Sequence, residues 1–157
     1  MPVSLTQVTF TGMRRKVFLF LCFGCFGMTV EIFFTAISKF VNQVVNQHTL
    51  DLSLTGTSYL WMFLIYGSIA FLMPVAQSLL DRYPLVTRLI GYTILIFTVE
   101  YFTGLFLDLV TGSCPWAYNS QWDVHGYIRL DYAPFWLVFS YMIERLYELL
   151  ARLALYV

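Results

Sequence analysis

The stretch from Val17 to Val41, VFLFLCFGCFGMTVEIFFTAISKFV, decides the fold. It contains only two charged residues, Glu31 and Lys39. Because an α-helix rises about 1.5 Å per residue, a helix of this length crosses the roughly 30 Å hydrocarbon core of a bilayer. The run shows no apolar–polar alternation, which argues against a strand of a membrane barrel. The stretch therefore predicts a transmembrane helix over residues 17–41.

Three further apolar stretches follow, over residues 59–80, 87–110 and 132–155. The chain as a whole is 59% hydrophobic and only 11% charged, whereas a soluble domain carries about 25% charged residues. Too little polar surface remains for a water-facing globule, so lipid must surround much of the protein. The sequence predicts an all-α, polytopic membrane protein, a bundle of four transmembrane helices that forms a single domain over residues 1–157.

The basic residues predict the orientation. If the four spans alternate in direction, most of these residues fall on one side: Arg14, Arg15, Lys16, Arg82, Arg88 and Arg152. The positive-inside rule then places both termini in the cytoplasm, in a cell membrane or an internal membrane.

The loops after the first and third spans then face outward. The second of these, residues 111–131, is rich in tryptophan and tyrosine. Such side chains favour the membrane–water interface. We therefore expect the loop to lie at the outer interface, with a lid over a cavity between the helices as the alternative.

A short sequence repeat links the first and third spans. Residues 29–33, TVEIF, recur as residues 98–102, TVEYF. Both spans are predicted to run outward, so a duplication would give two parallel hairpins related by an axis along the membrane normal. Five residues can also match by chance, so both interpretations stay open.

Charged residues deep in the spans are the first candidates for a site. Glu31, Glu100, Glu144 and Arg145 all lie within predicted spans, where an ionisable group is costly and needs a partner. If Glu148 pairs with Arg152, three glutamates share Arg145. This imbalance favours a protonated carboxylate or a bound cation, so we predict a ligand, ion or proton site. The alternative is a purely structural bridge from Arg145 to Glu31 and Glu100.

Secondary candidates are polar residues near these charges or in the outer loop: Thr35, Thr103, Tyr118, Asp123 and His125. Asp123 and His125 are too few for a metal site, and Cys22 and Cys25 lack a second ligand pair, so no metal is predicted. The net charge is zero and no phosphate-binding loop is present, so neither a nucleic-acid partner nor a cofactor is expected.

Several short motifs, in this order, resemble one known family. They are the residues around Glu31, the Glu-Tyr-Phe-Thr-Gly element at 100–104, the Trp-Ala-Tyr element at 116–118, and Met-Ile-Glu at 142–144. The chain resembles the CmpB-like "putative ABC-transporter type IV" family, which includes the transmembrane protein 229-like proteins, over roughly residues 28–148. The resemblance implies a multi-pass membrane protein with Glu31, Glu100 and Glu144 at family-type positions. The family usually has aspartate where Ala117 stands here, and Asp123 is the candidate substitute.

These observations predict a polar, carboxylate-lined cavity that binds or passes a small solute, a proton or a lipid headgroup. Its partners would be membrane lipids and other membrane subunits, and a transporter role would need a separate ATPase, since the chain has no nucleotide motif. Two alternatives remain: an intramembrane lipid-modifying enzyme with glutamates as acid and base, and a structural subunit of a larger complex.

Overall fold

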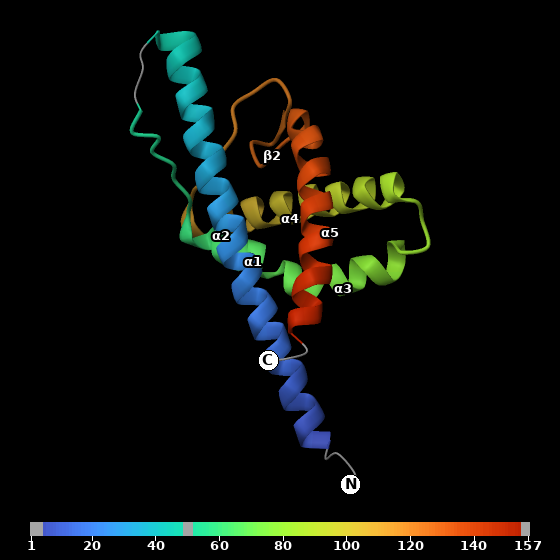
Figure 1. The fold of residues 1–157 in the computed structure, drawn as a ribbon. Coiled ribbons are helices and arrows are strands. Elements are labelled where there is room, and N and C mark those ends of the chain that lie inside the picture. Colours follow the sequence, from blue (N-terminus) through green and yellow to red (C-terminus); the bar gives the residue numbers. More distant parts are fainter. Residues whose placement is uncertain (1–4, 49–51, 155–157) are drawn as a thin grey trace. The chain divides into compact units, whose positions relative to one another are not determined.

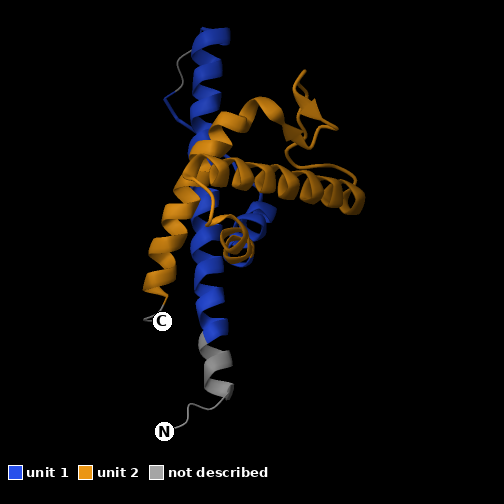
Figure 2. Ribbon diagram, turned by 90° about the vertical axis from the view of Figure 1, so that its right-hand side faces the viewer, with its two compact units in different colours: residues 1–71, 157 blue, residues 72–156 orange. Residues whose placement is uncertain are grey.

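The computed structural model describes residues 5–48 and 52–154, with side chains from Gly12 onward. The chain divides into two compact units, residues 1–71 and residues 72–156, which are coloured separately in Figure 2. Each unit is built around a helix, a long loop and a second helix that packs against the first. The prediction of one transmembrane domain over residues 1–157 stays a prediction.

Unit 1 is organised around one long helix, α1, over Leu5–Asn42. It continues as a π-helical turn, Gln43–Gln47, and stops at His48, whose φ of 52° lies in the left-handed region. Residues 52–59 run back beside α1 to the short helix α2, Leu60–Gly67 (Figure 1). The first span is therefore confirmed as a helix, although α1 begins well before the predicted start at Val17.

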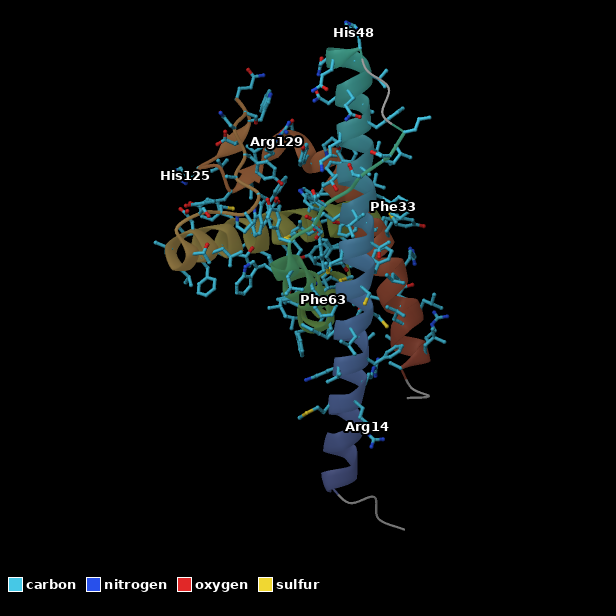
Figure 3. All side chains as sticks on the ribbon, turned by 90° about the vertical axis from the view of Figure 1, so that its left-hand side faces the viewer. Arg14, Phe33, His48, Phe63, His125 and Arg129 are labelled. Carbon is cyan, nitrogen blue, oxygen red and sulfur yellow. The ribbon has the colours of Figure 1, made fainter. Side chains whose placement is uncertain are left out.

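Glycines allow α1 and α2 to approach closely. A Cβ atom added at Gly24 would lie 2.7 Å from the ring of Phe63, the α2 residue labelled in Figure 3. A Cβ added at Gly27 would overlap the ring of Tyr66. Small residues serve this purpose at helix contacts in membranes.

The second apolar stretch forms two helices instead of one. α2 ends at Gly67 and α3 spans Ile69–Leu80, with a single non-helical residue, Ser68, between them. Pro74 lies inside α3. The interruption falls at Gly67–Ser68 because glycine is a poor helix former and the Ser68 hydroxyl donates to the Ile65 carbonyl at 2.6 Å.

Unit 2 contains α4, over Leu85–Thr111, and α5, over Ala133–Leu153. The two helices cross in Figure 1 and are joined where Arg88 bonds Glu144 and Thr93 bonds Ser140. α4 ends at Gly112, which has a φ of 79° and donates its N–H to the Asp108 carbonyl, the usual way in which glycine closes a helix.

The connecting loop between α4 and α5 has its own small fold. Strands β1, Asp123–Val124, and β2, Ile128–Arg129, pair antiparallel, with Asp123 opposite Arg129. A 3₁₀ turn, Leu130–Tyr132, then leads into α5.

Among the residues that the structure describes, three helical segments are long and apolar enough to cross a membrane: Gly12–Gln47, Leu60–Leu80 and Leu85–Thr111. Only 17–22% of the residues in their most apolar windows are buried, so most of their surface is left for lipid. Phe33 and Phe102, for example, are 64% and 62% exposed. The protein is therefore an integral membrane protein. α5 carries Glu144, Arg145, Glu148 and Arg152 and is not among the three.

Candidate functional site

One face of α4 carries two carboxylates. Glu100, Gly104 and Asp108 are spaced four residues apart, so they line up along one side of the helix. The glycine between the acids lets the loop approach: a Cβ at Gly104 would lie 3.2 Å from the Cβ of Tyr127. The loop therefore lies directly on the helix surface between the two acids.

Each of these carboxylates accepts a hydrogen bond from a phenol of the loop. The Tyr118 hydroxyl donates to Oε1 of Glu100 at 2.9 Å, and the Tyr127 hydroxyl donates to Oδ2 of Asp108 at 2.8 Å. Donation to Asp108 is the main reason why the pKa of Tyr127 is raised. We call Glu100, Asp108, Tyr118 and Tyr127 the tyrosine-capped carboxylate cluster.

A third tyrosine joins the helix to the tip of the loop. The Tyr101 hydroxyl is 2.8 Å from Nδ1 of His125, and the Tyr101 ring packs edge-on against Tyr127 at 5.5 Å. His125 has a φ of 54°, a left-handed conformation. Figure 3 labels it on the loop. Three tyrosines thus fasten the loop to α4.

Asp123 shapes the loop from within. Its two carboxylate oxygens accept the backbone N–H groups of Ser120 at 3.0 Å and Gly126 at 2.9 Å. These bonds favour the ionised form, so the pKa of Asp123 lies below its ordinary value. In this arrangement its oxygens hold the hairpin turn.

Arg129 lies against two aromatic rings at the start of α5. Its guanidinium is 4.2 Å from the centre of the Tyr132 ring and 5.9 Å from that of Tyr118, and it pairs with Asp131. The ion pair lowers the pKa of Asp131 and raises that of Arg129. Arg129 therefore ties the entry to α5 to the tyrosine that caps Glu100.

The loop end of unit 2 is strongly acidic. Residues 100–132 contain four carboxylates, those of Glu100, Asp108, Asp123 and Asp131, against the single arginine Arg129. Asp131 is neutralised by that arginine and Asp123 is bonded to backbone N–H groups. An acidic surface of this kind raises the local concentration of cations.

Glu144 is paired differently from the prediction. Its side chain is only 1% exposed and forms a two-pronged ion pair with Arg88, with Nε–Oε1 at 2.9 Å and Nη2–Oε2 at 3.2 Å. Arg145 pairs with Glu148, at 3.1 Å, on an exposed face. The sequence predicted that the span glutamates share Arg145, with Glu148 left to Arg152. This is wrong for Glu144 and Glu148, because α5 turns Glu144 toward Arg88 of α4 and leaves Arg145 to pair with Glu148.

Glu31 and Thr35 lie in unit 1, where both hold the first loop. The Ser58 hydroxyl donates to Oε2 of Glu31 at 3.1 Å, and the Tyr66 side chain is a second hydrogen-bonding neighbour. Thr35 donates to the Thr57 carbonyl and accepts from the Thr57 N–H, both at 2.9 Å. Residues 56–58 are thereby held against α1.

Among the predicted residues of unit 2, the structure brings together Glu100, Tyr118 and, through Tyr101, His125. Thr103 bonds only backbone carbonyls of its own helix, at Val99 and Glu100. Sequence reasoning missed Asp108 and Tyr127, and it missed Arg88 as the partner of Glu144. The spacing of Glu100, Gly104 and Asp108 along one helix face was the available signal for Asp108.

Comparison with family models places the chain beside known proteins. The family model described as "Putative ABC-transporter type IV" matches residues 18–156, which is nearly the whole chain and includes both units. No solved structure matches the chain.

Proposed function

The chain belongs to the "Putative ABC-transporter type IV" family, and from this premise we propose that it is a membrane subunit of a transporter system that binds a cationic group. The ligand would be a small ammonium-bearing solute, an ammonium headgroup of a lipid, or a proton. The subunit would work beside a separate ATPase, since its own sequence carries no nucleotide-binding motif.

The single observation that carries the proposal is the tyrosine-capped carboxylate cluster. Glu100 and Asp108 lie on an apolar, candidate membrane-spanning helix, and each accepts a side-chain hydrogen bond from a neutral phenol. Among the described residues, Asp108 forms no ion pair. A phenol stabilises a carboxylate without cancelling its charge, so the negative charge remains to attract a cation.

The surrounding rings favour an organic cation. Tyr118 and Tyr127 each contact one of the two acids, Tyr101 packs against Tyr127, and aromatic faces attract ammonium groups. The acidic loop end would concentrate such cations before they bind. Figure 2 shows the loop, in the orange unit, lying beside a helix of the same unit.

α5 would cross the membrane as the fourth span, completing the predicted four-helix bundle. Its two acids both have arginine partners, Arg88 for Glu144 and Arg145 for Glu148, and paired charges are the form in which ionisable residues occur within membranes. In this arrangement the arginine-rich end of unit 2 and both chain termini face the cytoplasm, and the acidic loop faces outward.

The test is calorimetric titration of the full chain in detergent with ethylammonium chloride. We expect Glu100→Gln and Asp108→Asn each to weaken ethylammonium binding at least tenfold, while Glu148→Gln, which alters an exposed ion pair, binds as the wild type does. The same titration in nanodiscs with and without phosphatidylethanolamine separates a free solute from a headgroup, since a bound headgroup would compete with ethylammonium. If the wild-type protein gives no binding heat and takes up no protons through Glu100, the proposal is wrong.

A further inference from the structure

The sequence repeat around the two span glutamates corresponds to a repeat in structure. In α1, the Thr29 hydroxyl donates to the Cys25 carbonyl at 2.8 Å, and in α4 the Thr98 hydroxyl donates to the Ile94 carbonyl at 2.8 Å. Each threonine thus bonds the residue four positions earlier and stands two positions before the glutamate. The two pentapeptides therefore share local geometry as well as letters.

The two glutamates also occupy the same place relative to the end of the helix. The α-helical part of α1 ends at Asn42 and α4 ends at Thr111, in each case eleven residues beyond the glutamate. Each helix is then followed by a long loop and, within its own unit, by a second helix that packs against it. A chance match of five letters would not reproduce this placement.

α1 and α4 resemble each other in which side chains they expose and which they bury around the glutamate. Phe33 and Phe102, two residues after the respective glutamates, are 64% and 62% exposed and so present rings to lipid. Glu31 and Glu100 are both partly buried. Each unit turns its glutamate toward its own loop and its phenylalanine outward.

The decisive similarity is the hydroxyl that each loop supplies. Ser58 of the first loop donates to Glu31 at 3.1 Å, and Tyr118 of the second loop donates to Glu100 at 2.9 Å. In unit 1 the donor is held in place by the two bonds between Thr35 and the backbone of Thr57, its neighbour. In unit 2 it is held by the tyrosine contacts of the loop. The two loops share no sequence pattern, but each donates a side-chain hydroxyl to the glutamate of its own unit.

From these correspondences we infer that the two units are copies of one helix–loop–helix module, and that Glu31 is a second binding residue for the same class of cation as Glu100. The inference rests on the proposed function for its ligand. Each module presents one loop-capped carboxylate, so cation binding is not confined to unit 2.

The experiment measures ethylammonium binding by calorimetry in the full chain carrying Glu31→Gln, Glu100→Gln or the matched control Glu148→Gln. We expect Glu31→Gln to lower either the affinity at least tenfold or the number of cations bound, as Glu100→Gln does, with Glu148→Gln unchanged. If Glu31→Gln binds like the wild type while Glu100→Gln loses binding, the inference fails and the proposed function stands. If both behave like the control, the proposed function itself fails.

Circular dichroism and thermal unfolding would reveal whether Glu31→Gln misfolds. In that case a second variant tests the inference. Ser58→Ala leaves the carboxylate in place and removes its donor. It should change the ethylammonium affinity by about threefold or more, whereas Ser78→Ala, whose hydroxyl bonds its own helix at Val75, should leave it unchanged. Equal affinities for the two serine variants would overturn the role of Glu31.

Discussion

Arg88 and Glu144, 56 positions apart in sequence, meet through two hydrogen bonds that join α4 to α5. The Glu144 side chain is almost fully buried, and the Tyr92 hydroxyl also donates to it at 3.3 Å. A buried ion pair of this kind fixes the register of two helices. Removing one partner destabilises the protein, because the other charge stays buried without compensation.

We expect Arg88→Met to destabilise unit 2 strongly, because it leaves the Glu144 carboxylate buried without its cation. An uncompensated buried carboxylate costs about 3–5 kcal/mol. Thermal unfolding in detergent measures the effect. Arg145→Met is the matched control, since its pair with Glu148 is exposed and exposed pairs contribute little. Equal losses in the two variants would contradict the assignment of the pairs.

Tyr118→Phe should loosen the outer loop. The substitution keeps the ring but removes the hydroxyl that bonds Glu100, so the backbone of residues 115–130 should exchange hydrogen faster, by several-fold. Hydrogen–deuterium exchange of the full chain reports this directly. Tyr59→Phe is the control, because the Tyr59 ring is half exposed and lies in unit 1, distant in sequence from residues 115–130. Unchanged exchange in Tyr118→Phe would mean that the phenol does not hold the loop.

Acidification should loosen the hairpin of the same loop. The pKa of Asp123 is lowered in the folded protein by backbone N–H groups, so its stabilising contribution is complete above the unfolded pKa of about 3.9 and is lost as the pH falls through the lower folded value. Asp131, lowered by Arg129, acts in the same direction. Near-ultraviolet circular dichroism should therefore show a transition below about pH 4.

Asp123→Ala should weaken the loop already at neutral pH and flatten its response to acid. Asp81→Ala, in the turn between α3 and α4, provides a control of equal charge change. A transition that is equally steep in both variants would exclude Asp123 as its source.

Gly27→Ala should disrupt the packing of α1 on α2. The added Cβ would overlap the Tyr66 ring, and overpacking of this type costs about 1–3 kcal/mol. Gly12→Ala meets nothing within 4 Å on the same helix and should be neutral or slightly stabilising, since alanine is the better helix former. Thermal unfolding of the two variants compares them, and a smaller loss for Gly27→Ala than for Gly12→Ala would rule out the close approach.

The membrane orientation can be tested by labelling. In a variant with the three cysteines replaced by serine, Ser120→Cys should react with a membrane-impermeant maleimide added outside intact cells. Asp81→Cys should react only after the membrane is opened. The reverse pattern would invert the proposed topology.

The helices could be predicted well from the sequence, because a membrane-spanning helix is determined by a long apolar run of consecutive residues. Apolar runs long enough to span a bilayer appear as α1, as α2 with α3, and as α4, with ends mostly within a few residues of the predicted ones. The break at Ser68 was not predicted, because the Gly67–Ser68 pair is inconspicuous within a long apolar run.

The site was only partly predictable, because its partners come from distant segments. Glu100 could be recognised as a charge within an apolar run, but nothing in the local pattern pairs Glu144 with Arg88 instead of Arg145. That choice depends on which side of α5 faces α4. Asp108 and Tyr127 were missed for the same reason: their contact depends on the path of the loop.

The pairing of Arg88 with Glu144 also bears on how the protein enters the membrane. During synthesis α4 emerges with its arginine while the matching acid is still 56 residues from being made, and α5 alone would bring an unmatched carboxylate into lipid. We expect the translocation machinery to retain α4 until α5 arrives and to release the two helices into the bilayer as a joined hairpin, so that chains truncated before Glu144 fail to integrate stably.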